Sequence, residues 1–297
     1  MKYPFMIADV FTKERFAGNP LAIVFEADGL PDETMLKIAQ EFNLSETIFV
    51  HKPRTLRHLA KVRIFTPTRE LPFAGHPTVG VSVALGLRHS TSAVRLEEQI
   101  GTVVAVMTPS GKMSGHARFG LPKLPERVGE VSNVDDVAEC LGLLPHQIGC
   151  GDLVPAVYSA GVAFTMVPVK DASVLKEIKF QRRGWVDIFG DQSTGVFVYS
   201  PTPLEDDVDY AARTFVDLNG FKEDPATGSA VSAMIGQLMD HGRFKEGQTD
   251  FVVRQGVEMG RPGFIEAQAK VEQGALVHAG LGGHVVITAH GELDLLS

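Results

Sequence analysis

Three polar residues of this 297-residue chain stand where they could move a proton at a carbon atom. Glu46 and Asp224 carry carboxylates, and His76 follows a glycine in the segment Pro72-Phe-Ala-Gly-His76. A carboxylate or histidine held beside a substrate is the usual general acid or base of such reactions. We therefore predict that Glu46, His76 and Asp224 are the catalytic residues of an enzyme that transfers a proton at carbon.

Two glycines each precede an apolar run that predicts a buried helix. Gly75 comes before Val79–Leu87, and Gly228 before Ala230–Leu238. Backbone N–H groups at the start of a helix bind an anion without a basic side chain, and they stabilise the negative charge that develops when a proton leaves the carbon next to a carboxylate. We predict a small carboxylate substrate. The predicted substrate-binding residues are Ser45, Gly75, Gly228 and Ser229.

The two glycine segments belong to an internal repeat. Glu70–Gly80 aligns without a gap with Glu223–Ser232, at an offset of 153 residues. Flanking segments align in the same order at offsets between 143 and 156. These further matches are Leu21–Val24 with Phe164–Val167, Ser45–Val50 with Ser193–Val198, Arg63 with Arg213, and Glu98-Gln99 with Arg254-Gln255. We interpret the chain as two copies of one unit.

Glu46 interrupts the repeat, because its counterpart in this alignment is Thr194. If Glu46 lies in an apolar cleft, desolvation would raise its pKa and suit it to proton transfer. The alternative is that Glu46 is a solvated acid at the end of a strand. The positive end of a helix dipole should keep His76 neutral. Asp224 could bind substrate, hold His76 or cap a helix. The repeat favours a functional role for Glu46.

The elements that must position these residues alternate between strand and helix patterns. Helices are predicted for residues 31–41, after each glycine turn, and for 171–179 and 208–217. Strands are predicted around 10–11, 21–25, 47–50, 61–66, 93–96 and 102–107, and at the chain end for 285–288 and 293–296. This pattern predicts an α+β fold, with a curved mixed β-sheet around a central helix in each half. Gly and Pro between residues 115 and 130 predict the boundary.

Composition excludes several classes of function. The net charge of -8 and pI near 5.7 give no electrostatic reason to expect nucleic acid or an anionic membrane as partner. No apolar run is long enough for a membrane span, and no signal peptide is recognisable. The two isolated cysteines fit a reducing compartment. We therefore expect a cytoplasmic protein. Nucleotide and classical hydrolase motifs are missing. His278, His284 and His290 lack metal-ligand spacing, so no metal is expected.

Several motifs together resemble the PhzF-like isomerase family of phenazine biosynthesis, over Asp9 to about Gly291. They are Asp9-Val-Phe-Thr12, Phe16-Ala-Gly-Asn-Pro-Leu-Ala22, Asn43-Leu-Ser-Glu-Thr47, Arg63-Ile-Phe-Thr-Pro67, Glu70-Leu-Pro-Phe-Ala-Gly-His-Pro-Thr78, Asp224-Pro-Ala-Thr-Gly-Ser-Ala230, and Gln255-Gly256 with Met259-Gly-Arg261. The resemblance implies the diaminopimelate-epimerase fold, with two pseudo-symmetric domains and the site between them. It implies residues 1–117 with a returning strand 285–297 as one domain, residues 118–284 as the other, and a homodimer.

The resemblance also implies roles for the site residues. Glu46 would be the acid and base that moves a proton between carbons, while His76 and Asp224 would bind and orient substrate, without a cofactor. Related racemases carry cysteines where this chain has Ala74 and Thr227. A one-base isomerase is therefore favoured. An epimerase or racemase of a small amino or hydroxy acid, and a non-catalytic metabolite-binding protein, are the alternatives.

Overall fold

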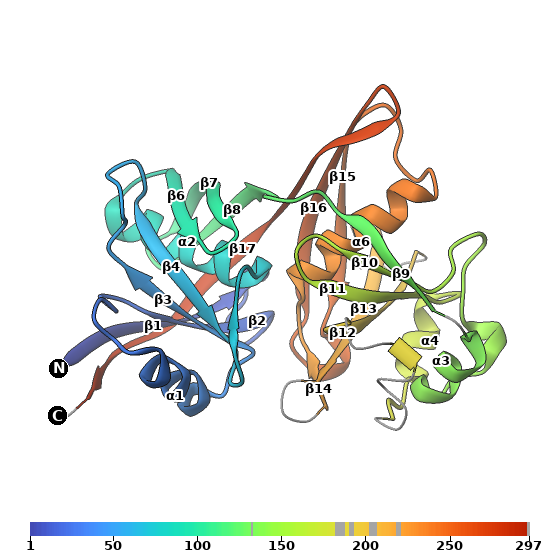
Figure 1. Ribbon diagram of the computed structural model, residues 1–297, viewed down its shortest axis with the longest axis horizontal. Helices are drawn as coiled ribbons and strands as arrows, with labels where there is room; N and C mark the ends of the chain where they lie inside the picture. The colour runs from blue at the N-terminus through green and yellow to red at the C-terminus, as the bar shows by residue number, and fades with distance from the viewer. Residues whose placement is uncertain (132, 182–187, 190–192, 202–206, 218–220, 296–297) are drawn as a thin grey trace. The chain divides into compact units, whose positions relative to one another are not determined.

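The computed structural model describes residues 1–131, 133–181, 188–189, 193–201, 207–217 and 221–295. The chain forms two compact units: Met1–Pro122 with Leu281–Ser297 is unit 1, and Lys123–Gly280 is unit 2 (Figure 1). Each unit combines many strands with helices, which confirms the α+β prediction. No helix among the described residues has the length and apolar character needed to cross a membrane.

Unit 1 contains the first ten elements of regular structure and the end of the last strand. They are β1 (Lys2–Val10), β2 (Asn19–Val24), α1 (Asp32–Phe42), β3 (Glu46–His51), β4 (Ala60–Phe65), β5 (Glu70–Leu71), α2 (Gly75–His89), β6 (Ala93–Glu98), β7 (Gly101–Gly111), β8 (Ser114–Gly120) and part of β17 (Ala275–Asp294).

Unit 2 repeats this arrangement and adds short helices before and within it. Its elements are β9 (Glu126–Glu130), α3 (Val134–Leu141), η1 (Pro145–Gln147), β10 (Ala156–Ser159), β11 (Ala163–Pro168), α4 (Ala172–Glu177), β12 (Gly195–Ser200), β13 (Tyr210–Asp217), β14 (Phe221–Asp224), α6 (Gly228–Asp240), β15 (Gly247–Gln255), η2 (Val257–Met259) and β16 (Gly263–Glu272).

The predicted repeat is present as repeated strand connectivity. In unit 1, β2 runs parallel to β3, which pairs antiparallel with β4. In unit 2, β11, β12 and β13 make the same pairings in the same order. A two- to four-residue strand and an apolar helix follow in each copy, after which β6 pairs in parallel with β4, as β15 does with β13. Equivalent residues can therefore be assigned by register.

The registers correct the counterpart of Glu46. Glu46 lies opposite Leu21 of the parallel neighbour, whereas the residue opposite the matching Phe164 is Gly195. The counterpart is therefore Gly195, and the expected match to Thr194 is wrong by one residue. A Cβ atom at Gly195 would come within 2.8 Å of the Phe215 carbonyl oxygen, so close packing excludes a side chain there. Unit 2 thus offers no acid at this position.

The same comparison corrects a second pair. Lys61 of β4 lies opposite Glu97, and Ala211 of β13 lies opposite Arg254. Since Lys61 and Ala211 occupy the same place in the repeat, the next residues along the strands, Glu98 and Gln255, are equivalent. The sequence alignment matched Glu98 with Arg254, and a one-residue slip of this kind turns each side chain to the opposite face of the sheet.

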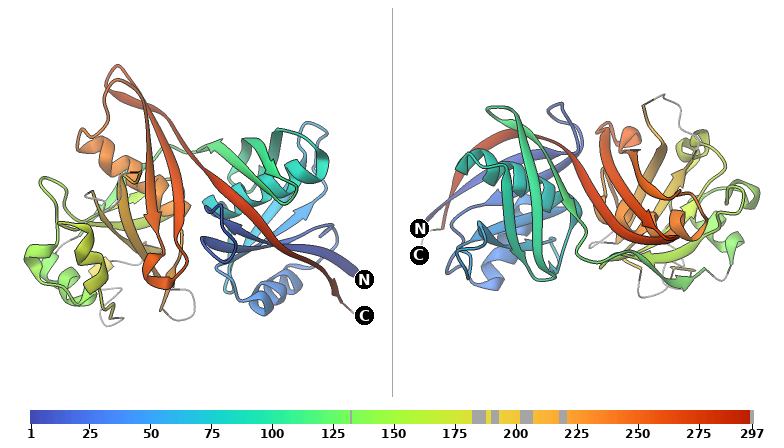
Figure 2. Two further views of the ribbon diagram at one scale, coloured as in Figure 1. Left: turned by 180° about the vertical axis from the view of Figure 1, so that it is seen from behind. Right: turned by 90° about the horizontal axis from the view of Figure 1, so that it is seen from above.

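The central helices begin where the sequence predicted. Helix α2 starts at Gly75 and α6 starts at Gly228, and both are buried over most of their length. Helix α2 packs against β7, β8 and β1 of its own unit, and α6 against β10, β11 and β16 (Figure 2). Because no charged face is needed on a helix surrounded by strands, small and apolar residues dominate both helices.

The helix predicted for residues 208–217 is wrong. Residues 210–217 form β13, which pairs with β12, β14 and β15. The local Ala211-Ala212 pair favours a helix, but three neighbouring strands supply backbone partners that override this preference. The predicted helix at 171–179 forms as the shorter α4.

The last strand pairs with the first. Val285–Asp294 of β17 lies antiparallel to β1, from Val10 opposite Val285 to Lys2 opposite Asp294. The two ends of the chain consequently lie side by side in unit 1 (Figure 1). Residues 296–297 of the predicted terminal strand lie outside the described residues.

Candidate active site

Unit 1 brings together two of the predicted catalytic residues, Glu46 and His76. Glu46 is the first residue of β3, and His76 is the second residue of α2, which packs against β3. The Oε2 atom of Glu46 lies 3.5 Å from Nε2 of His76, and their side chains are only 14% and 4% exposed. A carboxylate and an imidazole thus face one another with little exposure to solvent.

His76 is neutral at physiological pH. Burial lowers its pKa to about 3. The direction of this shift agrees with the sequence prediction. Its main cause is burial, whereas the sequence suggested the helix dipole. The side-chain nitrogen of Asn19 lies 3.4 Å from His76 Nδ1. With the amide donating to Nδ1, the ring proton resides on Nε2, which faces Glu46. His76 can therefore donate a hydrogen bond without carrying charge.

The loop before β2 holds Asn19 in place. Gly18 has a positive φ of 57°, and a Cβ atom there would come within 2.1 Å of the Val10 carbonyl oxygen, so only glycine fits. Asp9 fixes the same loop by accepting a 2.6 Å hydrogen bond from the backbone of Phe16. The sequence motif contained Asn19, but gave no indication of its contact with His76.

The predicted substrate-binding residues of unit 1 flank this pair in the sequence. Ser45 directly precedes β3 and is partly buried, and Gly75 opens α2. The residue before the helix, Ala74, has extended backbone and makes no side-chain cap. The backbone N–H groups of Gly75 and His76 consequently have neither an intrahelical acceptor nor a capping side chain from Ala74, whereas the N–H of Thr78 donates to the Ala74 carbonyl at 3.3 Å.

Unit 2 contains the other predicted site residues. Asp224 ends β14 and is buried, and its Oδ2 accepts a 2.5 Å hydrogen bond from the Thr227 hydroxyl. Gly228 opens α6 and Ser229, partly buried, follows it. The carboxylate is therefore tied to the residue that precedes the helix.

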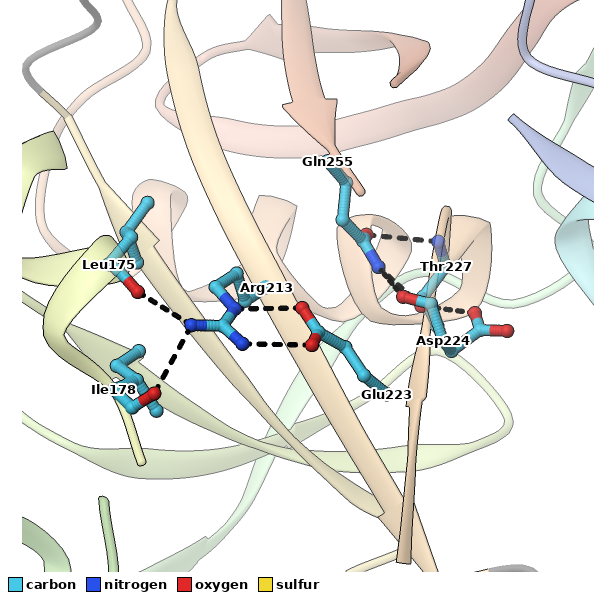
Figure 3. A network of polar contacts seen from close by, with 7 residues as sticks. All are labelled: Leu175, Ile178, Arg213, Glu223, Asp224, Thr227 and Gln255. Carbon is cyan, nitrogen blue, oxygen red and sulfur yellow. Dashed lines mark hydrogen bonds and ion pairs between the residues drawn. The ribbon is translucent and has the colours of Figure 1, made fainter. Parts of the chain in front are cut away.

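Gln255 organises this turn, a role the sequence reasoning missed. Its Oε1 accepts from the Thr227 backbone N–H at 3.0 Å, and its Nε2 donates to the Asp224 carbonyl at 2.5 Å and to the Thr227 hydroxyl at 3.0 Å (Figure 3). Gly256 has a φ of 80°, and a Cβ atom there would lie 2.5 Å from the Pro225 carbonyl oxygen. The glycine lets the two backbones approach, which brings Gln255 to the start of α6.

An arginine–glutamate pair recurs in both units just before the central helix. Arg63 binds Glu70 through two hydrogen bonds of 2.7 and 2.5 Å, and Arg213 binds Glu223 at 2.7 and 2.8 Å (Figure 3). Each guanidinium also lies 5.1 Å from the ring centre of the phenylalanine two residues on. The alignment matched these residues without indicating their contact. The pairs fix the short strands β5 and β14.

Neither cysteine occupies a helix start. Cys140 is buried, burial raises its pKa to about 11, and its thiol donates to the Gln181 carbonyl. Cys150 is free and partly buried. Among the described residues no group of three His, Cys, Asp or Glu side chains is arranged to hold a metal ion.

Comparison with known proteins places these features in a family. A family described as phenazine biosynthesis-like protein matches residues 8–291. An uncharacterised isomerase of Mesorhizobium japonicum is 39% identical over 297 residues, with 97% of this chain and 98% of that protein covered. The trans-2,3-dihydro-3-hydroxyanthranilate isomerase of Pseudomonas chlororaphis is 31% identical over 291 residues, covering 98% and 99%.

A solved structure supports the same fold. The PhzF-family phenazine biosynthesis protein of Bacillus anthracis matches with a TM-score of 0.88 at 23% identity, over 99% of this chain and all of that one (100%). This likeness extends to both units and supports the predicted fold. The chain therefore belongs to the PhzF family of phenazine biosynthesis-like isomerases.

Proposed function

We propose that this chain is a cofactor-independent isomerase that moves a proton between two carbons of a small carboxylate, with Glu46 as the acid and base. The observation that carries the proposal is the buried contact between Glu46 and the neutral His76, at 3.5 Å. A site that only binds an anionic ligand would need backbone N–H groups but no carboxylate such as Glu46. A carboxylate that removes and returns a proton needs this kind of protected position.

The reaction follows in two balanced steps. The Glu46 carboxylate takes a proton from one carbon, and the electron pair left behind spreads into the conjugated carboxylate of the substrate. The protonated Glu46 then returns the proton to a second carbon, so substrate and product are isomers. Backbone N–H groups at Gly75 and Gly228 would stabilise the intermediate charge, with Ser45 and Ser229 binding the substrate. The proposal puts the substrate between the two units, as the family resemblance implies.

His76 and Asp224 would position the substrate. With its proton on Nε2, His76 can hydrogen-bond either the Glu46 carboxylate or a polar group of the substrate. The Asp224 carboxylate is held by the Thr227 hydroxyl and, through the backbone, by Gln255. We expect the contacts with Asn19 and Thr227 to keep His76 and Asp224, respectively, in one orientation during the reaction.

The substrate class that we propose is a cyclic, partly unsaturated amino acid. The relative at 31% identity is named for trans-2,3-dihydro-3-hydroxyanthranilate, a ring of this kind with a carboxylate. Incubation of the wild-type protein with a panel of dihydroaromatic and aliphatic carboxylates, followed by NMR, tests the proposal. Conversion of a ring carboxylate into an isomer of equal mass supports it, and no conversion of any member argues for a binding protein.

We expect small carboxylates to raise the thermal midpoint of unfolding even in excess chelator, because backbone N–H groups and not a metal would bind them. At concentrations about a hundred times the dissociation constant, the gain should correspond to roughly 2.7 kcal/mol. A matched uncharged amide of the same ring serves as the control. Stabilisation that disappears with chelator would contradict a cofactor-free site.

We also expect the product to keep one stereochemical series. Ala74 and Thr227 cannot act as bases at neutral pH, so a proton can be handled only on the face that Glu46 reaches. Chiral analysis of product from a single enantiomer checks this expectation, alongside alkylation of Cys140 and Cys150. Full racemisation, or loss of activity on alkylation, would favour the epimerase alternative.

Two further properties belong to the proposal. The free cysteines favour the cytoplasm as its compartment. The family resemblance favours a homodimer, which light scattering at micromolar concentration would test.

A further inference from the structure

The carboxyl group of Glu98 is buried beneath the start of α2. Glu98 is the last residue of β6 and only 8% exposed. Its Oε1 lies 2.8 Å from the hydroxyl of Thr78, in the first turn of α2. The Thr78 hydroxyl lies equally close, 2.8 Å, to the carbonyl oxygen of Ala74, the residue that precedes Gly75 and His76.

The hydroxyl of Thr78 has one proton for these two contacts. A carbonyl oxygen cannot donate, so the bond between Thr78 and Ala74 uses that proton. The contact with Glu98 is then a hydrogen bond only if the carboxyl group donates. The geometry is therefore satisfied by a neutral carboxylic acid, which donates to Thr78, which donates to Ala74.

The equivalent residue of unit 2 supports this assignment. Gln255 has the same place in the repeat as Glu98, and its amide nitrogen donates to the hydroxyl of Thr227, the residue that precedes α6. That hydroxyl in turn donates to Asp224. An amide always donates, and a protonated carboxyl group is close to it in shape. Both units thus secure the helix start by a neutral donor and a threonine hydroxyl.

We infer that Glu98 is a positioning residue that works in its protonated form, and that its ionisation loosens the start of α2 and with it His76. Ionised Glu98 would draw the Thr78 proton away from Ala74. The carbonyl of Ala74 would then keep only the backbone N–H of Thr78, at 3.3 Å. The inference rests on the proposed function only where it links the helix start to catalysis.

The surroundings of Glu98 favour the neutral form. Burial raises its pKa to about 8, although a hydrogen bond that the Thr78 hydroxyl would donate to the ionised carboxylate opposes part of that shift. Its Oε2 has no hydrogen-bond partner in the part of the chain that the structure describes, and Glu98 lines a cavity of about 240 Å³. The other charged groups that line this cavity are Arg54, Lys61, Arg63, Glu70 and Glu97. His76, on the same helix as Thr78, is neutral. Arg63 is bound to Glu70, and the backbone of Arg54 donates to Glu97.

Unfolding at different pH values tests the protonation state without any substrate. Folded Glu98 keeps its proton up to about pH 8, whereas the unfolded chain loses it near 4.5, so wild-type stability should fall as pH rises between these values. Glu98→Gln keeps the donor and removes this loss. The difference between its thermal midpoint of unfolding and that of the wild type should therefore rise by roughly 5 °C, in favour of the variant, from pH 5 to pH 8.5.

The control is Glu41→Gln, an exposed glutamate of α1, whose midpoint should follow the wild type at every pH. Parallel curves for Glu98→Gln and wild type would overturn the inference, since Glu98 would then be ionised in the folded protein. A Glu98→Gln variant less stable by the same amount at every pH would overturn the donor role.

The link to catalysis has its own measurement. With the substrate found by the panel above, wild-type kcat should fall about tenfold between pH 7 and pH 9, as one group near pH 8 ionises, and Glu98→Gln should lose much less. An identical alkaline decline in both proteins would overturn the positioning role. If no substrate is found, the proposed function fails while the unfolding curves still decide the protonation of Glu98.

Discussion

Replacing Glu46 with Gln is expected to lower kcat by about two to four orders of magnitude. The amide has nearly the same size, so the start of β3 should keep its structure, but it can neither take nor return a proton. The contact with His76 Nε2 can persist through the amide oxygen, so substrate binding should change much less than kcat. Steady-state kinetics on the identified substrate measures both.

Glu41→Gln provides the control for this prediction, because Glu41 is exposed at the end of α1, five residues before Glu46. Its kcat should match that of the wild type. Circular dichroism of Glu46→Gln should show an intact fold. Turnover by Glu46→Gln within a few-fold of the wild type would remove Glu46 from the proton transfer.

Replacing Arg213 with Ala is expected to lower the free energy of unfolding by about 3 to 5 kcal/mol. The guanidinium makes two hydrogen bonds to Glu223, whose side chain is only 17% exposed, and donates to the Leu175 carbonyl at 2.7 Å. Removing it leaves a buried carboxylate and a carbonyl without their donor, a larger penalty than the loss of a surface ion pair. Urea unfolding measures the change.

The internal repeat offers a matched comparison for Arg213. Arg63 and Glu70 form the same pair in unit 1, with side chains 19% and 30% exposed, so Arg63→Ala should be less destabilising. The double variant Arg213→Ala with Glu223→Ala should recover part of the lost stability, because no carboxylate remains unpaired. Equal small losses in the free energy of unfolding of both arginine variants would show that burial does not determine how much these pairs stabilise the protein.

The fold was predictable from the sequence because the repeat preserved local signals. Gly75 and Gly228 each precede a long apolar run, and the strand patterns around them occur twice. Local propensity failed at residues 210–217, where two alanines favour a helix but strand pairing on each side determines the structure. The register of the repeat was predictable only to within one residue. Gly195 and Gln255 were therefore not recognised as the equivalents of Glu46 and Glu98 in the second unit.

The site was predictable as a set of residue types, and less so as a set of contacts. Glu46 and His76 were expected near the same helix start, and the structure gives their distance and burial. The contacts of Asn19 and Gln255 depend on backbones that meet across the fold, which a sequence pattern does not encode. The neutral state of His76 was expected from the helix dipole, whereas burial is the stronger cause.

The central claim, proton transfer between carbons by Glu46, is tested most directly by the position of deuterium in product formed in heavy water. The wild type and Glu41→Gln should form an isomer with at most one deuterium, located at the carbon that receives the proton. Glu46→Gln should form no isomer, labelled or unlabelled, within the same time. Deuterium incorporation by Glu46→Gln at the wild-type rate, or an isomer labelled at some other carbon, would contradict the account.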